Sequence, residues 1–500
     1  MVAAASRKPW ADRALFVAAV SLGTLAIAAF LVLSLYFRLA HPAQLEWMEG
    51  GILVEIRRIL AGQAVYVRPS LDFIPFIYAP VFFYISAAAT WICGDTLLAP
   101  RLVSFSATLM TAALLYAFGY RISKTKSAGW LTAAVYIAAF KVCGQWFDLA
   151  RIDALAYLFA VAALYALHEG TARWSWILSA GLAVAAFYTK QTTAFMIAGM
   201  GAGLCISDKR RGLAYCAVVG LGVAMLWAIA HLRSQGWFTY YAYSLPASFP
   251  IKGLHWRTFL FQDLPLGLPL IAAAAALRIL GAHRQGPCME PLLMGTWAGA
   301  LMSAFWSRIH YGAAENALMP LYLALALTVP FALSWSTAWR WPPLGHAAVA
   351  LQLLLLSYNP LKVIPWQGDS AATQALVAEL KALDGEVFLP SHPHLLQDAR
   401  HRANAHASPL WDVMTDSQTP EALALDAELH QAMASGRYRY FLAGDDSQGF
   451  VQTMGRHYRL YRRLSGPVVE GNALTCVTGF TFRPSMIFRF QDDSKSIAAP

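Results

Sequence analysis

The sequence predicts a mainly α-helical fold: a polytopic transmembrane bundle of about eleven spans, followed by a small extracytoplasmic α/β domain. Hydrophobic residues make up 58% of the 500 residues and charged residues only 13%, about half the share found in soluble domains. The apolar residues are gathered in long uncharged runs. Beyond Pro360 these runs stop, and Asp, His, Arg and Pro become frequent.

The net charge of +10 would suggest a nucleic-acid partner if the protein were soluble. Here the cations stand in short loops between apolar runs, so membrane topology and anionic lipid head groups explain them better. We therefore expect membrane lipids as partners and no nucleic acid. The six cysteines show no metal-ligand spacing.

The uncharged run 14–37 is too long for a signal-peptide core and long enough to cross a bilayer. Because cations precede it, we expect an uncleaved first span with a cytoplasmic N-terminus. Ten further spans are expected at 102–120, 127–140, 154–167, 174–189, 191–207, 212–230, 264–277, 291–307, 317–335 and 344–358.

The apolar segment 73–93 decides the topology. If it stays on the outer surface, the two densest cation clusters, RISKTK and DKRRG, both face the cytoplasm, as the positive-inside rule requires. If it crosses, both face outward. Pro75, Pro80 and several aromatic residues suit an interfacial helix. We therefore expect a multi-pass protein of a bacterial inner membrane, with its acidic loops and C-terminal domain on the periplasmic side.

Two domains are expected: a transmembrane domain over 1–360, whose first outer loop at 38–97 carries juxtamembrane helices, and an α/β domain over 361–500. No internal repeat is visible, which counts against the inverted-repeat transporter folds. Helices in the α/β domain are predicted at 371–383 and 420–435, and strands at 386–389, 437–442 and 458–464.

The first outer loop carries three carboxylates close to the membrane surface: Glu46, Glu49 and Glu55. A carboxylate in this position can act as general base on a hydroxyl or hold a divalent cation. A solvated polar loop is the simpler interpretation. Arg57 and Arg58, which follow, then serve as interfacial anchors.

Further charged residues stand where later spans begin or end. Asp153 opens an apolar run beside Arg151, where a charge is costly and therefore suggests function; the alternative is an acid that complements the helix dipole. Lys190 lies between two apolar runs, and it either snorkels to the surface or binds a phosphate.

Another outer loop carries Arg308, His310, Tyr311 and Asn316, and the guanidinium of Arg308 suits a phosphate. Acids and cations thus come from four separate loops on one side of the membrane. This combination indicates a charged substrate that is anchored in the membrane.

The order of these motifs resembles the GT-C superfamily of membrane glycosyltransferases, in particular the protein O-mannosyltransferases and lipid A aminoarabinose transferases of glycosyltransferase family 39. MEGGILVEI resembles the acidic motif of that family, with Glu49 at the position of its catalytic Asp. RIDAL resembles its second acid, at Asp153, and FYTKQTTAF its "TK" element, at Lys190. The resemblance covers residues from about 10 to about 340.

The sequence departs from the family at two places. Where the family usually has two acidic residues in a row, this sequence has Glu49 followed by Gly50. The segment IYAPVFFY resembles the one that carries a phosphate-contacting Lys before a Pro in the aminoarabinose transferases. Here that Lys is absent, and Tyr78 stands near its position. Arg57, Arg68 or Arg308 then has to supply the missing cation.

The resemblance implies an inverting glycosyltransferase that uses a polyprenyl-phosphate sugar as donor and an acceptor hydroxyl on the outer face. Glu49 would take the acceptor proton, and Lys190, Arg308 and Arg151 would hold the phosphate. Asp153 would orient groups around Glu49, or bind the acceptor or a metal. The sugar, the acceptor (a glycan, lipid or protein of the cell envelope) and a requirement for Mg²⁺ or Mn²⁺ stay open. So do two other classes, a transporter or lipid flippase and a non-enzymatic envelope assembly protein.

Overall fold

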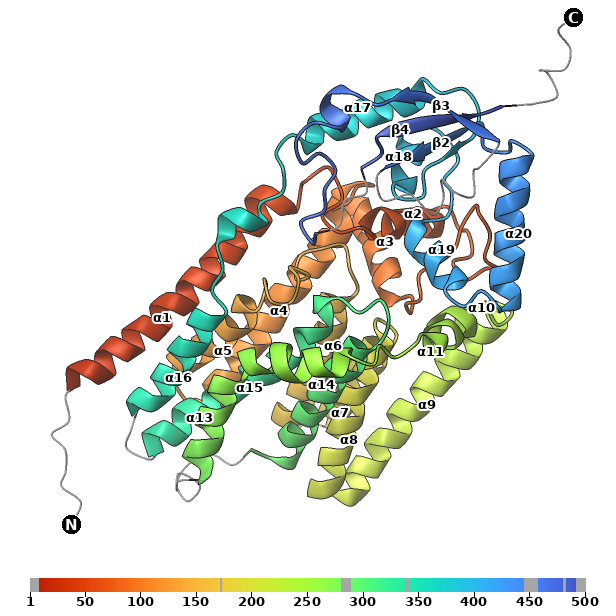
Figure 1. Cartoon of the computed structure of the whole chain (residues 1–500). Helices are drawn as coiled ribbons and strands as arrows, with labels where there is room; N and C mark the ends of the chain where they lie inside the picture. The colour runs from red at the N-terminus through yellow and green to blue at the C-terminus, as the bar shows by residue number, and fades with distance from the viewer. Residues whose placement is uncertain are drawn as a thin grey trace, which may run out of the picture.

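The computed structural model describes residues 9–170, 173–279, 289–338, 342–444, 457–479 and 483–491. The chain is mainly helical. Figure 1 shows a bundle of long helices and, at one end of it, a small mixed domain formed by the C-terminal part of the chain. The short helices α2 and α3 lie between the bundle and that domain.

Each of the eleven apolar runs forms a helix. These helices are α1 (Pro9–Val32), α4 (Leu98–Ser123), α5 (Lys126–Ala138), α6 (Asp153–Glu169), α7 (Arg173–Phe187), α8 (Ala194–Ser207), α9 (Lys209–Arg233), α13 (Leu268–Ile279), α14 (Pro291–Ile309), α15 (Met319–Ala338) and α16 (Pro342–Leu355). Shorter helical segments between them are η1 (Leu33–Arg38), η2 (Gln191–Thr193), α10 (Trp237–Thr239), η3 (Tyr240–Ser244), α11 (Leu245–Ser248), α12 (His255–Thr258), η4 (Phe259–Asp263), η5 (Leu264–Leu266), η7 (Glu315–Leu318) and η8 (Pro360–Val363).

The number of membrane spans is not confirmed as about eleven. Among the described residues, four helical stretches are long and apolar enough to cross a bilayer, and a bent pair around α13 would make a fifth. Apart from α14, which has 19 residues, the other apolar helices are clearly shorter than the roughly 20 residues that a straight crossing needs. They are helices because their apolar runs favour helix, but their length alone does not make them spans.

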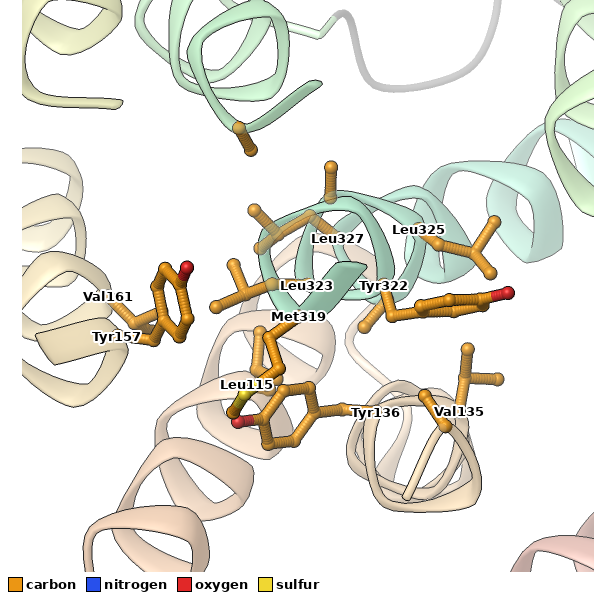
Figure 2. Close-up of a cluster of buried hydrophobic side chains, with 14 of the residues drawn as sticks. Leu115, Val135, Tyr136, Tyr157, Val161, Met319, Tyr322, Leu323, Leu325 and Leu327 are labelled. Atoms are coloured by element: carbon orange, nitrogen blue, oxygen red, sulfur yellow. The ribbon is translucent and has the colours of Figure 1, made fainter. Parts of the chain in front are cut away.

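Helix α15 occupies the centre of the bundle. Its most apolar window is 94% buried, whereas that of α9 is 11% buried. A helix that is hydrophobic on all sides is stable only inside other helices or in lipid. Figure 2 shows Tyr136 of α5 beside Met319 of α15, and Tyr157 of α6 beside Leu323 of α15.

The first outer loop folds into α2 (Glu49–Leu60) and α3 (Val81–Cys93). At 1.5 Å per residue, the 13 residues of α3 reach about 20 Å, which is less than the roughly 30 Å of a hydrocarbon core. Helix α3 is therefore too short to cross a bilayer alone. Its exposed Tyr84, Trp91 and Ile92 fit the interfacial position that the cation distribution predicts.

The C-terminal domain contains a four-stranded sheet with strand order β1-β2-β4-β3. Strands β1 and β2 are parallel, and the other two pairings are antiparallel. Two expected helices and three expected strands are present, but β4, α18, α19 and η9 were not predicted. The elements are α17 (Asp369–Lys381), β1 (Val387–Phe388), α18 (Pro393–Asp398), α19 (Ala407–Met414), α20 (Pro420–Ala434), β2 (Tyr440–Ala443), β3 (Tyr458–Arg463), η9 (Gly466–Val468) and β4 (Met486–Phe490).

The C-terminal domain is joined tightly to the first outer loop. His406 Nε2 lies 2.9 Å from the carbonyl oxygen of Trp47, and Gln44 Nε2 lies 2.6 Å from His392 Nδ1. A side chain at Gly50 would meet His394 Nδ1 and Gln44 Oε1. The second residue of the Glu-Gly pair therefore has to be small, because the C-terminal domain packs directly against it.

Candidate active site

Glu46, Tyr78 and Arg151 form one half of a buried polar site. Arg151 Nη2 donates to the hydroxyl of Tyr78 at 2.8 Å, and Arg151 Nη1 lies 3.4 Å from Glu46 Oε1. The backbone N–H of Met48 donates to the other oxygen of Glu46 at 2.9 Å. The three residues come from the first outer loop and the loop before α6, so the site joins segments far apart in the chain.

Burial raises the pKa of Glu46 to about 7, although Arg151 and the Met48 N–H act against that rise. Glu46 thus changes its protonation state near neutral pH. Burial would lower the pKa of Arg151, but Glu46, Tyr78 and Asp153 outweigh it and raise that pKa above its usual value. The guanidinium is therefore a permanent cation in the site.

Asp153, Lys190 and Asn316 form the other half. Lys190 Nζ donates to Asp153 Oδ1 at 2.5 Å, and Asn316 Nδ2 donates to the same oxygen at 3.0 Å. Asp153 is the first residue of α6, Lys190 follows α7, and Asn316 lies in η7 before α15. Asp153 and Arg151 are two residues apart on the same loop and helix start, which places the two halves side by side.

The C-terminal domain covers this site through α19. Its half-buried Asp412 is an electrostatic neighbour of both Arg151 and Tyr78. Burial raises the pKa of Asp412 to about 7, and the cation of Arg151 opposes that rise. Burial also lowers the pKa of His406 to about 3, so this histidine at the start of α19 is neutral at physiological pH.

Glu49 has a different environment from the one expected of a general base. Arg101 donates to both of its oxygens, and the backbone N–H groups of Leu45 and Ala150 donate one hydrogen bond each, at 2.6 and 2.8 Å. Burial would raise the pKa of Glu49, but Arg101 and these N–H groups outweigh it and lower that pKa. All its acceptor positions are therefore occupied by protein groups.

Two buried arginines, Arg38 and Arg101, hold the loops around the site. The sequence analysis did not identify them. Arg101 stands in the first turn of α4. Arg38, at the end of η1, donates to both oxygens of Asp148 at 2.8 Å, and both side chains are fully buried. A cation that ends an apolar run opposite an acid in the next outer loop is the signal that could have identified this pair.

The other expected site residues lie outside the cluster. Glu55 is buried in α2 with its Oε2 3.5 Å from the N–H of Phe76, and burial raises the pKa of Glu55 to about 8. Arg308 pairs with Asp263 at 2.8 Å. The remaining expected residues have these surroundings: Arg57 bonds Asp95 and Asp398, Arg58 donates to the carbonyl of Ala64, Arg68 is exposed, His310 lies against the carbonyl of Trp306, and the Tyr311 hydroxyl accepts from Trp411.

A metal centre finds no support in the geometry. Within the ranges that the structure describes, no three His, Cys, Asp or Glu side chains are grouped so that they could hold a metal ion. Around the site, the carboxylates of Glu46 and Asp153 each face a cation of the protein instead. We therefore derive no step through Mg²⁺ or Mn²⁺.

Residues 78–229 match the family model described as dolichyl-phosphate-mannose-protein mannosyltransferase. No curated protein matches the chain by sequence. Among solved structures, ArnT from Cupriavidus metallidurans bound to undecaprenyl phosphate is 14% identical, with a TM-score of 0.58 over 96% of this chain and 99% of that chain. The oligosaccharyltransferase of Archaeoglobus fulgidus is 11% identical, with a TM-score of 0.50 over 87% of this chain and 71% of that chain.

These likenesses confirm the resemblance that the loop motifs predicted. The structural likeness to ArnT extends over nearly the whole length of the ArnT chain, including its C-terminal part. The family match covers the segment from Tyr78 through Asp153 and Lys190 to α9. The chain is a mainly helical, multi-pass membrane protein with the fold of the GT-C membrane glycosyltransferases.

Proposed function

We propose that the protein is an inverting glycosyltransferase that moves a sugar from a polyprenyl-phosphate donor to an acceptor hydroxyl. One observation carries the proposal: Glu46, Tyr78, Arg151, Asp153 and Lys190 come from separate loops into a single buried cluster beneath the C-terminal domain. A site with two cations and two carboxylates suits a donor that is anionic at the phosphate and polar at the sugar.

The phosphate is held by Arg151 and Lys190. Both side chains are almost fully buried, where a charge interacts more strongly than at the surface. Each is paired with one carboxylate in this structure, which keeps the cations in place before the donor binds. As the bond between the anomeric carbon and the phosphate oxygen breaks, the phosphate gains charge, and the two cations stabilise it most in that transition state.

The acceptor hydroxyl loses its proton to Glu46. A general base is most effective when its pKa lies close to the working pH, and the raised pKa of Glu46 meets that condition. The acceptor oxygen then attacks the anomeric carbon from the face opposite the phosphate, through a transition state of oxocarbenium character. One displacement gives inversion. Because its acceptor positions are filled, Glu49 has a positioning role in this proposal.

The acceptor is a hydroxyl of a cell-envelope glycan, lipid or protein, and we place the site and the C-terminal domain on the periplasmic side of a bacterial inner membrane. The cation distribution in the loops supports this orientation. Glu46 and Asp153 have no solvent exposure, so a substrate reaches them only when a covering segment moves. The packing of Trp47 against Trp146, with ring centroids 5.7 Å apart, is part of this cover.

Mass spectrometry of co-purified lipid tests the proposal. We expect the wild-type protein to carry a polyprenyl phosphate, with or without one sugar, and the double variant Arg151→Gln Lys190→Gln to carry little of it. The matched control Lys252→Gln, which changes a lysine that stacks on Tyr311, should retain the lipid. A wild-type protein that neither carries such a lipid nor binds added undecaprenyl phosphate would exclude this function.

A further inference from the structure

A group of buried polar atoms without hydrogen-bond partners lies next to Asp153. The group consists of Asp153 Oδ2, Arg151 Nε, Trp146 Nε1 and the hydroxyls of Tyr136 and Tyr157, and we call it the polar cluster. Of these, the Tyr157 hydroxyl also lies close to the ammonium of Lys190. None of these residues is more than 3% exposed. A buried polar group that lacks a partner costs free energy, and most such groups in native proteins bind water or a ligand.

The residues of the polar cluster are neighbours of one another and of the two cations of the site. The guanidinium carbon of Arg151 lies 5.9 Å from the ring centre of Trp146, and Lys190 Nζ lies 5.6 Å from that of Tyr157. Tyr136 and Tyr157 are both electrostatic neighbours of Asp153. Figure 2 shows Tyr136 beside Met319 and Tyr157 beside Leu323, both against α15.

The hydrogen-bonding character of the polar cluster excludes a phosphate as its occupant. A phosphate needs donors only, and the free oxygen of Asp153 would repel it. The cluster offers two pure donors in Arg151 Nε and Trp146 Nε1, one pure acceptor in Asp153 Oδ2, and two hydroxyls that both donate and accept. Groups that alternate between donor and acceptor match a polyol, in which every hydroxyl does both.

We infer that the polar cluster is the subsite for the hydroxyl groups of the donor sugar. The inference rests on the proposed function, because it takes the phosphate of that donor to lie on Arg151 and Lys190. The two cations are the neighbours of the polar cluster, so a sugar one bond away from the phosphate falls beside it. The rings of Trp146, Tyr136 and Tyr157 form the apolar walls that sugar-binding sites need between polar contacts.

Binding measurements on phenylalanine variants test the subsite. The full-length protein in nanodiscs is titrated, by native mass spectrometry, with undecaprenyl phosphate and with synthetic undecaprenyl-phosphate hexoses, pentoses and amino sugars. We expect at least one sugar conjugate to bind more tightly than undecaprenyl phosphate. Tyr136→Phe should weaken that conjugate by roughly 2- to 10-fold, the loss expected for one hydrogen bond, and leave undecaprenyl phosphate unchanged. Tyr157→Phe should weaken the conjugate more than it weakens undecaprenyl phosphate, because Tyr157 also lies beside Lys190.

Tyr322→Phe is the matched control. Its hydroxyl is also buried and without a partner, but Figure 2 shows its ring on the other side of α15 from Tyr157. We expect this variant to bind both kinds of lipid like the wild type. The inference is overturned if every sugar conjugate binds no better than undecaprenyl phosphate, which is the result for a cluster filled by water. It is also overturned if the tyrosine variants weaken both lipids equally. Failure of undecaprenyl phosphate itself to bind would instead refute the proposed function, and the subsite with it.

Discussion

Arg101 donates all five of its N–H groups, and two of them go to the carboxylate of Glu49. Nε lies 2.9 Å from Oε1 and Nη2 lies 2.6 Å from Oε2, and neither side chain is exposed. The other three bonds go to the carbonyl oxygens of Arg38, His41 and Ala43. One arginine thus holds the end of the first helix, the start of α2 and the start of α4 together, directly beneath the site.

The first prediction concerns this ion pair. Lysine keeps the charge, but its three donors on one nitrogen cannot replace the five hydrogen bonds of Arg101 and leave buried acceptors unsatisfied. Arg101→Lys should therefore lower the free energy of unfolding by about 3 kcal/mol. Thermal unfolding in detergent measures the change. Arg57→Lys is the control, because Arg57 pairs with the partly exposed Asp95 and Asp398, and we expect a loss below about 1 kcal/mol. Equal losses for the two variants would contradict the structural role of Arg101.

The second prediction concerns Lys190. If it stabilises the leaving phosphate, Lys190→Gln should lower kcat by roughly 100- to 1000-fold, as the loss of a preorganised charge partner does elsewhere. Lys190→Arg should recover part of the rate, because it restores the charge with a different geometry. Single-turnover transfer from labelled undecaprenyl-phosphate sugar is the measurement. Full activity of Lys190→Gln would remove Lys190 from the mechanism.

The third prediction concerns the pH dependence of transfer. A general base works only when it is ionised, and burial raises the pKa of Glu46 to about 7. The rate should therefore rise with pH through about 7 and level off above it, with roughly a tenth of the maximal rate at pH 6. Initial rates between pH 5.5 and pH 8.5 show the profile, and Glu46→Gln should abolish both the activity and the rise. A flat profile would exclude Glu46 as the base.

The fourth prediction concerns Glu55. Burial raises its pKa from 4.5 to about 8 in the folded protein, so folding favours the neutral acid. The stabilisation that the neutral acid gives is complete below pH 4.5 and is lost as the pH rises through about 8. Glu55→Gln, which is neutral at every pH, should therefore melt higher than the wild type at pH 8 and by a much smaller margin at pH 5. Glu470 is exposed, so the control Glu470→Gln should melt at the wild-type temperature at both pH values. A lower melting temperature of Glu55→Gln than of the wild type at pH 8 would contradict the raised pKa of Glu55.

The fifth prediction concerns the contact between α2 and the C-terminal domain. A Cβ at Gly50 would lie 2.6 Å from Gln44 Oε1 and would also meet His394, so Gly50→Ala should destabilise the protein by about 1–3 kcal/mol. Gly220→Ala, in α9, is the matched control, because nothing lies within 4 Å of its Cβ position. That change should be neutral or stabilise by up to about 1 kcal/mol. Thermal unfolding of the two variants measures both changes, and an equal effect of the two would contradict the close packing at Gly50.

The positions of the helices were largely predictable because helix formation depends on local pattern. Every long apolar run became a helix, and the helices and three strands expected after Pro360 are present. The strand β4 was missed because a five-residue strand near a chain end carries little local signal. Its place between β2 and β3 comes from pairing across the sheet, not from its own residues.

By itself, the sequence determined that acids and cations stand at the ends of apolar helices, and it singled out Glu46, Asp153, Arg151 and Lys190. It could not determine which carboxylate has a pKa suited to a general base. Glu49 and Glu46 are three residues apart and look alike in the chain. Arg101 and two backbone N–H groups fill the acceptor positions of Glu49, whereas burial raises the pKa of Glu46. Only the tertiary structure brings Arg101 there, because hydrogen bonding and burial depend on which segments pack together.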